Sequence, residues 1–100
     1  MITLDAIVGF DWDEGNRAKI LARHNVLWTE VEEVFSNTPL LLLSDEKHSG
    51  IEERFHALGH THNRLFLHLT FTLRKHKTLL RVISARPMNR KERAFYEKET

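Results

Sequence analysis

The sequence has 100 residues, of which 41% are hydrophobic and 29% charged, and it has no cysteine. This composition is typical of one globular domain spanning residues 1–100 and argues against intrinsic disorder. The lack of cysteine excludes disulfides, thiol nucleophiles and thiolate metal sites, whereas the net charge of +1 alone excludes nothing.

The chain is expected to begin with a strand and a helix. Residues 7–12 predict a short strand. The acidic residues from Asp13 onward oppose a helix dipole, so a helix is predicted to run from there to about Arg23. Asn25 tolerates the left-handed conformation and is expected to end this helix.

A second short helix and a second strand are predicted next. Thr29 and Glu32 have the spacing of a capping box, which places a helix start at Thr29. This helix should end before Asn37. The apolar run at residues 40–43 predicts a buried strand, and the polar stretch at residues 44–50 predicts a loop.

Three longer strands are expected in the second half, at residues 54–60, 65–73 and 79–85. Apolar residues recur at every second position of the middle one, which is the period of a strand with one buried face. Turn residues at 62–63 and near 75–76 should join the three strands as hairpins.

The chain should end in a polar helix at residues 90–99, because Asn89 and Glu92 again have capping-box spacing. These elements together predict an α+β fold. We expect an antiparallel β-sheet of about four to five strands, with two N-terminal helices on one face and a C-terminal helix.

The charge is distributed unevenly along the chain. Residues 1–50 carry 4 basic and 9 acidic side chains, and residues 51–100 carry 11 basic and 5 acidic ones. A basic surface attracts polyphosphates through counterion release, so nucleic acid is a candidate partner. No segment approaches the ~20 apolar residues of a membrane span, and the N-terminus has no basic region before its apolar residues, as a signal peptide would. We therefore expect no membrane association and a cytoplasmic location.

Arginines cluster near the C-terminus. Arg81 interrupts an apolar strand, which is costly unless the cation has a partner or faces a cleft. Arg93 and Tyr96 share a helix face, with Arg90 one turn earlier. Guanidinium groups suit phosphate, and a tyrosine can stack on a base, although a solvated charged helix is an equally good interpretation.

A second candidate group combines Arg23 and His24 with Glu53 and Arg54. A histidine can transfer protons near neutral pH, and the flanking charges can stabilise phosphoryl groups or orient a hydroxyl. The alternatives are a cation at a helix C-terminus for His24 and a surface ion pair for Glu53 with Arg54.

The chain has seven histidines, and two of them suggest a metal site. His60 and His62 have the spacing of ligands on one side of a strand. No nearby carboxylate completes a ligand set, so this interpretation is the weakest. The remaining histidines of the second half and the loop before it are His48, His56, His68 and His76.

Blocks of residues along the chain match a known family in order and spacing. They are Phe10-Asp-Trp-Asp-Glu14, Asn16, Ala22-Arg-His-Asn-Val26, Val31-Glu-Glu-Val-Phe35, Pro39-Leu40, Glu52-Glu-Arg-Phe55, Gly59, Arg64-Leu65, Arg81-Val-Ile-Ser-Ala-Arg86, Arg90-Lys-Glu-Arg93 and Tyr96. Over residues 8–98 the sequence therefore resembles the BrnT toxins.

The resemblance implies a RelE-like fold and cleavage of RNA with neither metal nor cofactor. It also implies a BrnA-like antitoxin, a ribbon-helix-helix DNA-binding protein that neutralises the toxin. A homodimer and a heterotetramer with the antitoxin are both open.

Carried over by position, the resemblance implies a set of site residues. Where the family usually has Lys-His-Gly, this chain has Arg23-His24-Asn25, so a lysine that transfers a proton would be lost while a positive charge would be kept. The implied catalytic residues are His24, Glu53, Arg54, Arg81, Arg86 and Tyr96, and the implied RNA-binding residues are Arg23, Ser84, Arg90 and Arg93.

The implied reaction is attack of a ribose 2′-hydroxyl on the adjacent phosphate. It needs a base, cations for the developing charge and an acid for the leaving oxygen. We expect Arg54, Arg81 and Arg86 to stabilise charge, and His24 or Glu53 to transfer protons. Two rival functions are a non-catalytic RNA-binding or operon co-repressor protein and a metal-dependent enzyme built on the histidines.

Overall fold

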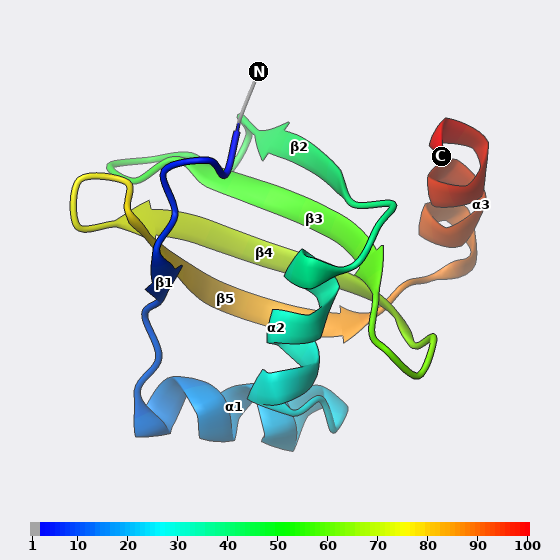
Figure 1. Cartoon of the computed structure of the whole chain (residues 1–100), viewed down its shortest axis with the longest axis horizontal. Coiled ribbons are helices and arrows are strands. Elements are labelled where there is room, and N and C mark those ends of the chain that lie inside the picture. Colours follow the sequence, from blue (N-terminus) through cyan, green and yellow to red (C-terminus); the bar gives the residue numbers. More distant parts are fainter. Residues whose placement is uncertain (1–2) are drawn as a thin grey trace.

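The computed structural model describes residues 3–100 and contains three helices and five strands in that range (Figure 1). In chain order they are β1 (Gly9–Phe10), α1 (Glu14–His24), α2 (Trp28–Ser36), β2 (Leu41–Asp45), β3 (Arg54–His60), β4 (Phe66–Arg74), β5 (Leu79–Pro87) and α3 (Arg90–Glu99). The α+β class and the order of elements agree with the prediction.

The five strands form one sheet in the order β1-β5-β4-β3-β2 (Figure 1). The strands from β2 to β5 are antiparallel to their neighbours, as expected, but β1 runs parallel to β5. The sheet is therefore mixed, so the prediction of a purely antiparallel sheet is wrong at this edge. Since β1 joins β5 from the other end of the chain, no tight hairpin turn sets its direction.

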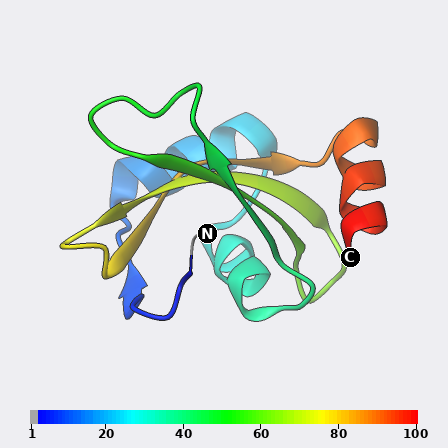
Figure 2. The same cartoon turned by 90° about the horizontal axis from the view of Figure 1, so that it is seen from above.

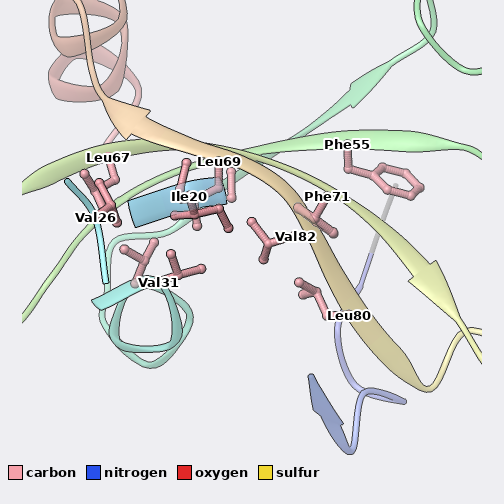
Figure 3. Packing of buried hydrophobic residues seen from close by; sticks show 12 residues of the cluster. Ile20, Val26, Val31, Phe55, Leu67, Leu69, Phe71, Leu80 and Val82 are labelled. Atoms are coloured by element: carbon pink, nitrogen blue, oxygen red, sulfur yellow. The ribbon is translucent and has the colours of Figure 1, made fainter. Parts of the chain in front are cut away.

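Helices α1 and α2 share one hydrophobic core with the sheet, but only α2 packs over a face of it, whereas α1 lies along the β5 edge (Figure 1). In Figure 3, Ile20 of α1 and Val31 of α2 gather against Leu69, Phe71 and Val82 of the sheet. Burying apolar area contributes roughly 25 cal/mol per Å², so this cluster is a main source of stability. Helix α2 thus covers one face of the sheet and α1 lines the edge of β5, while neither helix covers the other face.

Helix α1 has the ends predicted from the sequence, whereas α2 begins earlier. The Asp13 side chain caps α1, and Asn25 ends it with φ of 56°. The N-cap of α2 is Leu27, so the predicted start at Thr29 is wrong. The Glu30 carboxylate accepts a hydrogen bond from the Leu27 backbone N–H at 2.9 Å and takes the role expected of Glu32.

Several strand boundaries also differ from the prediction, with β4 shifted by one residue at each end. Strand β1 covers only Gly9 and Phe10 of the predicted residues 7–12. Strand β2 continues through Ser44 and Asp45, which were expected in a loop, because it pairs with β3 along its whole length. Strand β5 extends to Pro87, two residues beyond the predicted end.

The outer edge of β5 is only partly covered by a strand. Strand β1 pairs with Leu79 and Leu80 alone, and α1 lies along the rest of this edge. There the Asn16 side-chain amide donates a hydrogen bond to the Val82 carbonyl at 2.7 Å. A side chain of α1 thus satisfies part of an edge that would otherwise be free to pair.

In the part of the chain that the structure describes, none of the helices has the length and apolar character needed to cross a membrane.

Candidate active site

The sheet face turned away from α1 and α2, here called the open face, carries most of the polar side chains of the three long strands. Side chains alternate between faces along a strand, and the register fixes which ones share a face. The helices leave this face uncovered between the loop of residues 46–53 and α3, which stand at its two ends (Figure 2). Its polar residues include Arg54, His56, His68, Thr70, Arg81, Ser84 and Arg86.

A β-bulge in β5 brings three of these residues to the open face. Thr72 pairs with Arg81, while Thr70 pairs with Ser84, so Ile83 is the extra residue. Without the bulge, strict alternation would turn Ser84 toward the core. The bulge therefore places Arg81, Ser84 and Arg86 on one face.

The three arginines expected to stabilise charge lie on this same face but not around one point. Arg54 and Arg81 flank β4 from its two neighbouring strands, which puts their backbones about 10 Å apart. Arg86 lies five residues beyond Arg81 on β5, at about 17 Å. The arginines thus form a row along the face.

Arg81 has acidic partners from the segment between β1 and α1. Its guanidinium donates to the Asp13 carboxylate at 2.9 Å and to the Asp11 carbonyl at 3.2 Å. The pKa of Asp13 is lowered, first by the hydrogen bond from the Asn16 backbone and then by Arg81. These contacts explain how a cation is accommodated in an apolar strand.

Arg86 is also paired, whereas Arg54 is not. Both Nη atoms of Arg86 donate to the Glu92 carboxylate at 2.8 Å. This pairing is the main reason that the pKa of Glu92 falls to about 2 and that the pKa of Arg86 rises. Arg54 is exposed and forms no ion pair within residues 3–100, so it is the free cation of the three.

The middle of the open face holds a histidine network that the sequence analysis did not assign to the site. His56 Nε2 lies 3.0 Å from the Asp45 carboxylate, and the His56 ring lies 4.7 Å from that of His68, tilted at 45° to it. Burial acts to raise the pKa of Asp45, but hydrogen bonds from His48 and the histidine charges outweigh it and lower this pKa. Burial lowers the pKa of His68, and Arg86 and His56 lower it further against the effect of Glu92.

Three other predicted site residues lie together at the β5 edge of the sheet. A small cavity between α1 and β5 is lined by Arg23, His24 and Ser84, together with Lys19. Ser84 also pairs with Thr70, so this cavity adjoins the open face. His24 therefore lies beside the arginine row, beyond its outer strand.

Glu53 is directed away from Arg54. It lines a hollow with Phe55 and Leu73, which belong to the helix-covered face, and its carboxylate lies 3.8 Å from Lys77 Nζ. Glu53, just before β3, and Arg54, its first residue, thus lie toward opposite sides of the sheet.

The α3 residues lie at the far end of the face. Tyr96 is buried, its hydroxyl donates to the Pro39 carbonyl at 2.5 Å, and its pKa is raised by burial. The Arg93 guanidinium lies 3.5 Å from the centre of the Phe66 ring and also pairs with Glu97. Arg90 is exposed beside a surface hollow that it shares with Arg93.

The histidines considered for a metal site have other contacts. The ring nitrogens of His60 lie 3.0 Å from the Thr61 carbonyl and 3.1 Å from the Thr38 carbonyl. His62 Nδ1 lies 3.1 Å from the Asn37 side-chain amide. Across residues 3–100, no group of three or more histidine or acidic side chains has the geometry of a metal site.

Comparisons with known proteins agree with this architecture. A family model described as "Ribonuclease toxin, BrnT, of type II toxin-antitoxin system" matches residues 12–92. The 1.1 Å crystal structure of the Brucella abortus ribonuclease toxin BrnT superposes with a TM-score of 0.61, covering 82% of this chain and 97% of that one. The two sequences are 21% identical, so this likeness shows a shared fold. No curated protein matches the chain.

Proposed function

Since the chain belongs to the BrnT family of ribonuclease toxins of type II toxin-antitoxin systems, we propose that it cleaves RNA on its open face by a metal-independent reaction. In that reaction the ribose 2′-hydroxyl attacks the adjacent phosphate and the 5′-oxygen of the next nucleotide leaves. The observation that carries the proposal is that Arg54, Arg81 and Arg86 lie on one sheet face, free of α1 and α2.

The charges of this face support binding of an RNA backbone. Arg54 is free to contact phosphate, and guanidinium donors match phosphate oxygens. Arg81 and Arg86 are already paired with carboxylates, so RNA has to exchange with Asp13 and Glu92 to reach them. A row of arginines suits successive phosphates of one strand, with Arg90 and Arg93 continuing it at the α3 end.

Arg54→Ala tests the proposal, because it removes a charge from the face without breaking an ion pair. Lys91→Ala, at an exposed position of α3, is the matched control. Under tight induction, the wild type and Lys91→Ala should arrest growth and degrade RNA. Arg54→Ala should slow cleavage by purified protein roughly 10- to 1,000-fold.

The chemistry of the products tests the mechanism. Cleavage should persist in EDTA, should leave a 2′,3′-cyclic phosphate, and should stop when the substrate carries a 2′-deoxyribose at the cut site. Wild-type protein that binds RNA for hours without cutting it would instead support a binding or co-repressor protein. Loss of activity in EDTA and in His60→Ala would support a metal-dependent enzyme.

We also propose that the antitoxin is a BrnA-like ribbon-helix-helix protein. In a type II system the antitoxin is a protein that binds the toxin. An acidic or apolar segment of such an antitoxin is suited to cover the arginine row. Co-expression with the product of the adjacent reading frame should restore growth and yield a stable complex. An adjacent frame that encodes a different DNA-binding fold, yet neutralises the toxin, would contradict this identity.

A further inference from the structure

Two histidines from neighbouring strands stand side by side in the middle of the open face. His56 on β3 pairs with Thr70, and His68 on β4 pairs with Leu58, so the histidines are diagonal neighbours. Their ring centres are 4.7 Å apart. The side chains are 27% and 13% exposed, so both are partly accessible from solvent.

The contacts of His56 fix the orientation of its ring. The pKa of Asp45 is low, so its carboxylate only accepts, and His56 Nε2 at 3.0 Å must carry the proton. His56 Nδ1 lies 3.1 Å from the Thr70 hydroxyl, which can either donate to it or accept from it. Nδ1 is therefore the atom at which His56 can gain or release a proton.

His68 has weaker polar contacts than His56, and charged side chains lie beside it. Its Nε2 lies 3.7 Å from the Glu92 carboxylate, and Arg86 faces it across the β4–β5 ladder. Its Nδ1 is buried and has no hydrogen-bond partner in the described part of the chain. Burial lowers its pKa, so the ring is neutral near pH 7 and can accept a proton.

We propose, on the basis of the ribonuclease function above, that His68 and His56 are the proton-transfer residues of the cleavage reaction. The O–H bond of the 2′-hydroxyl breaks and its proton goes to His68 Nε2, while the 2′-oxygen bonds to phosphorus. The bond from phosphorus to the 5′-oxygen then breaks, and this oxygen takes a proton from Nδ1 of His56, whose ring starts the cycle protonated on both nitrogens. The products are a 2′,3′-cyclic phosphate and a 5′-hydroxyl, and the two rings exchange one proton to return to their starting states.

Asp45 is a positioning residue in this scheme, because it acts through His56. His68 lies directly opposite Arg86, and His56 lies between that pair and the level of Arg54 and Arg81. His24, in the cavity beyond β5, is the competing candidate for proton transfer.

The test compares purified His56→Gln and His68→Gln with wild type on two substrates. One is ordinary RNA, and the other carries sulfur in place of the 5′-oxygen at the cut site, so that the leaving group needs no acid. On RNA, each variant should be slower by about 100- to 10,000-fold. On the sulfur substrate, His56→Gln should recover to within about threefold of wild type, whereas His68→Gln should not.

The controls separate catalysis from folding. His76→Gln, on the exposed β4–β5 hairpin, should behave as wild type on both substrates. Asp45→Asn should shift the alkaline limb of the wild-type pH–rate profile and keep part of the activity. A variant that merely loosens the sheet would slow both substrates equally, and that result in His56→Gln would overturn its role as the acid.

The outcomes also distinguish this inference from the proposed function. If the wild-type protein never cuts RNA, both the proposed function and this inference are wrong. If the wild type cuts RNA and both histidine variants cut it equally well, only the inference fails. Cleavage lost in His24→Gln but kept in His68→Gln would transfer the base to the α1–β5 cavity.

Discussion

Arg86 on β5 and Glu92 on α3 form a bidentate ion pair that joins the last helix to the sheet. The two nitrogen–oxygen distances are 2.8 Å each, and Glu92 also accepts a hydrogen bond from the Asn89 backbone N–H at 2.9 Å. One carboxylate thus anchors α3 and caps it. The pKa of Glu92 falls from 4.5 to about 2 in the folded chain. The pair therefore stabilises the fold above about pH 4.5, and this contribution is lost as the pH falls through about 2.

Glu92→Gln should lower the free energy of unfolding by about 1–3 kcal/mol at pH 7, since hydrogen bonds to charged groups contribute that much. Urea unfolding at pH 7 and at pH 3 measures it. The gap between wild type and variant should shrink at pH 3, because protonation of Glu92 in the unfolded chain already removes part of the effect in the wild type. Glu99→Gln at the end of α3 is the control, and an equal gap at both pH values would contradict the prediction.

Gly59→Ala should destabilise the fold, because α2 packs directly on β3 at this residue. A methyl group there would lie 2.8 Å from Val34 Cγ1 and 3.2 Å from Leu40 Cδ1. Overpacking of this kind costs about 1–3 kcal/mol, which should appear as a lower Tm. At Gly50→Ala the new methyl group meets no atom of residues 3–100 within 4 Å, so Tm should be unchanged. Equal Tm values for the two variants would show that α2 can move aside.

Asn25→Gly should keep or slightly raise stability, because Asn25 ends α1 with φ of 56° and glycine adopts this conformation without strain. Asn25→Ala should instead cost about 1 kcal/mol. Thermal unfolding of the two variants gives the comparison. A loss in Asn25→Gly as large as in Asn25→Ala would mean that the side chain, and not the backbone conformation, matters here.

Asp13→Ser should release Arg81 for RNA. Serine still caps α1, but it lacks the charge that holds the Arg81 guanidinium at 2.9 Å. RNA should bind more tightly, and the slope of log K against log salt should steepen by about 0.7 for one added phosphate contact on a single strand. Asp5→Ser serves as the control. An unchanged slope would place Arg81 outside the RNA contact.

Local signals predicted most of the fold. The acidic residues from Asp13 onward gave the start of α1, and the capping-box spacing of Asn89 and Glu92 gave the start of α3. The left-handed preference of Asn25 gave the end of α1. The start of α2 was missed because an acidic side chain three residues into the helix can cap a backbone N–H even when the N-cap is Leu27. The direction of β1 and the bulge at Ile83 depend on contacts between distant segments, which no local pattern records.

The site was harder to predict, because its geometry depends on register. Arg93 and Tyr96 do share a helix face, as their spacing predicts, but both pack against Phe66 of the same chain. His56 and His68 were visible only as histidines in apolar strands. Their juxtaposition depends on how β3 and β4 align, since a shift of one residue would move either ring to the other face.

The parallel pairing of β1 with β5 has a consequence for synthesis of the chain. Gly9 and Phe10 find their partners only at Leu79 and Leu80, and Asp13 meets Arg81 in the same region. Contacts between such distant residues form late, because a long loop must close first. A nascent chain must therefore expose residue 81 before β1 can join the sheet and before Asp13 can hold the Arg81 guanidinium.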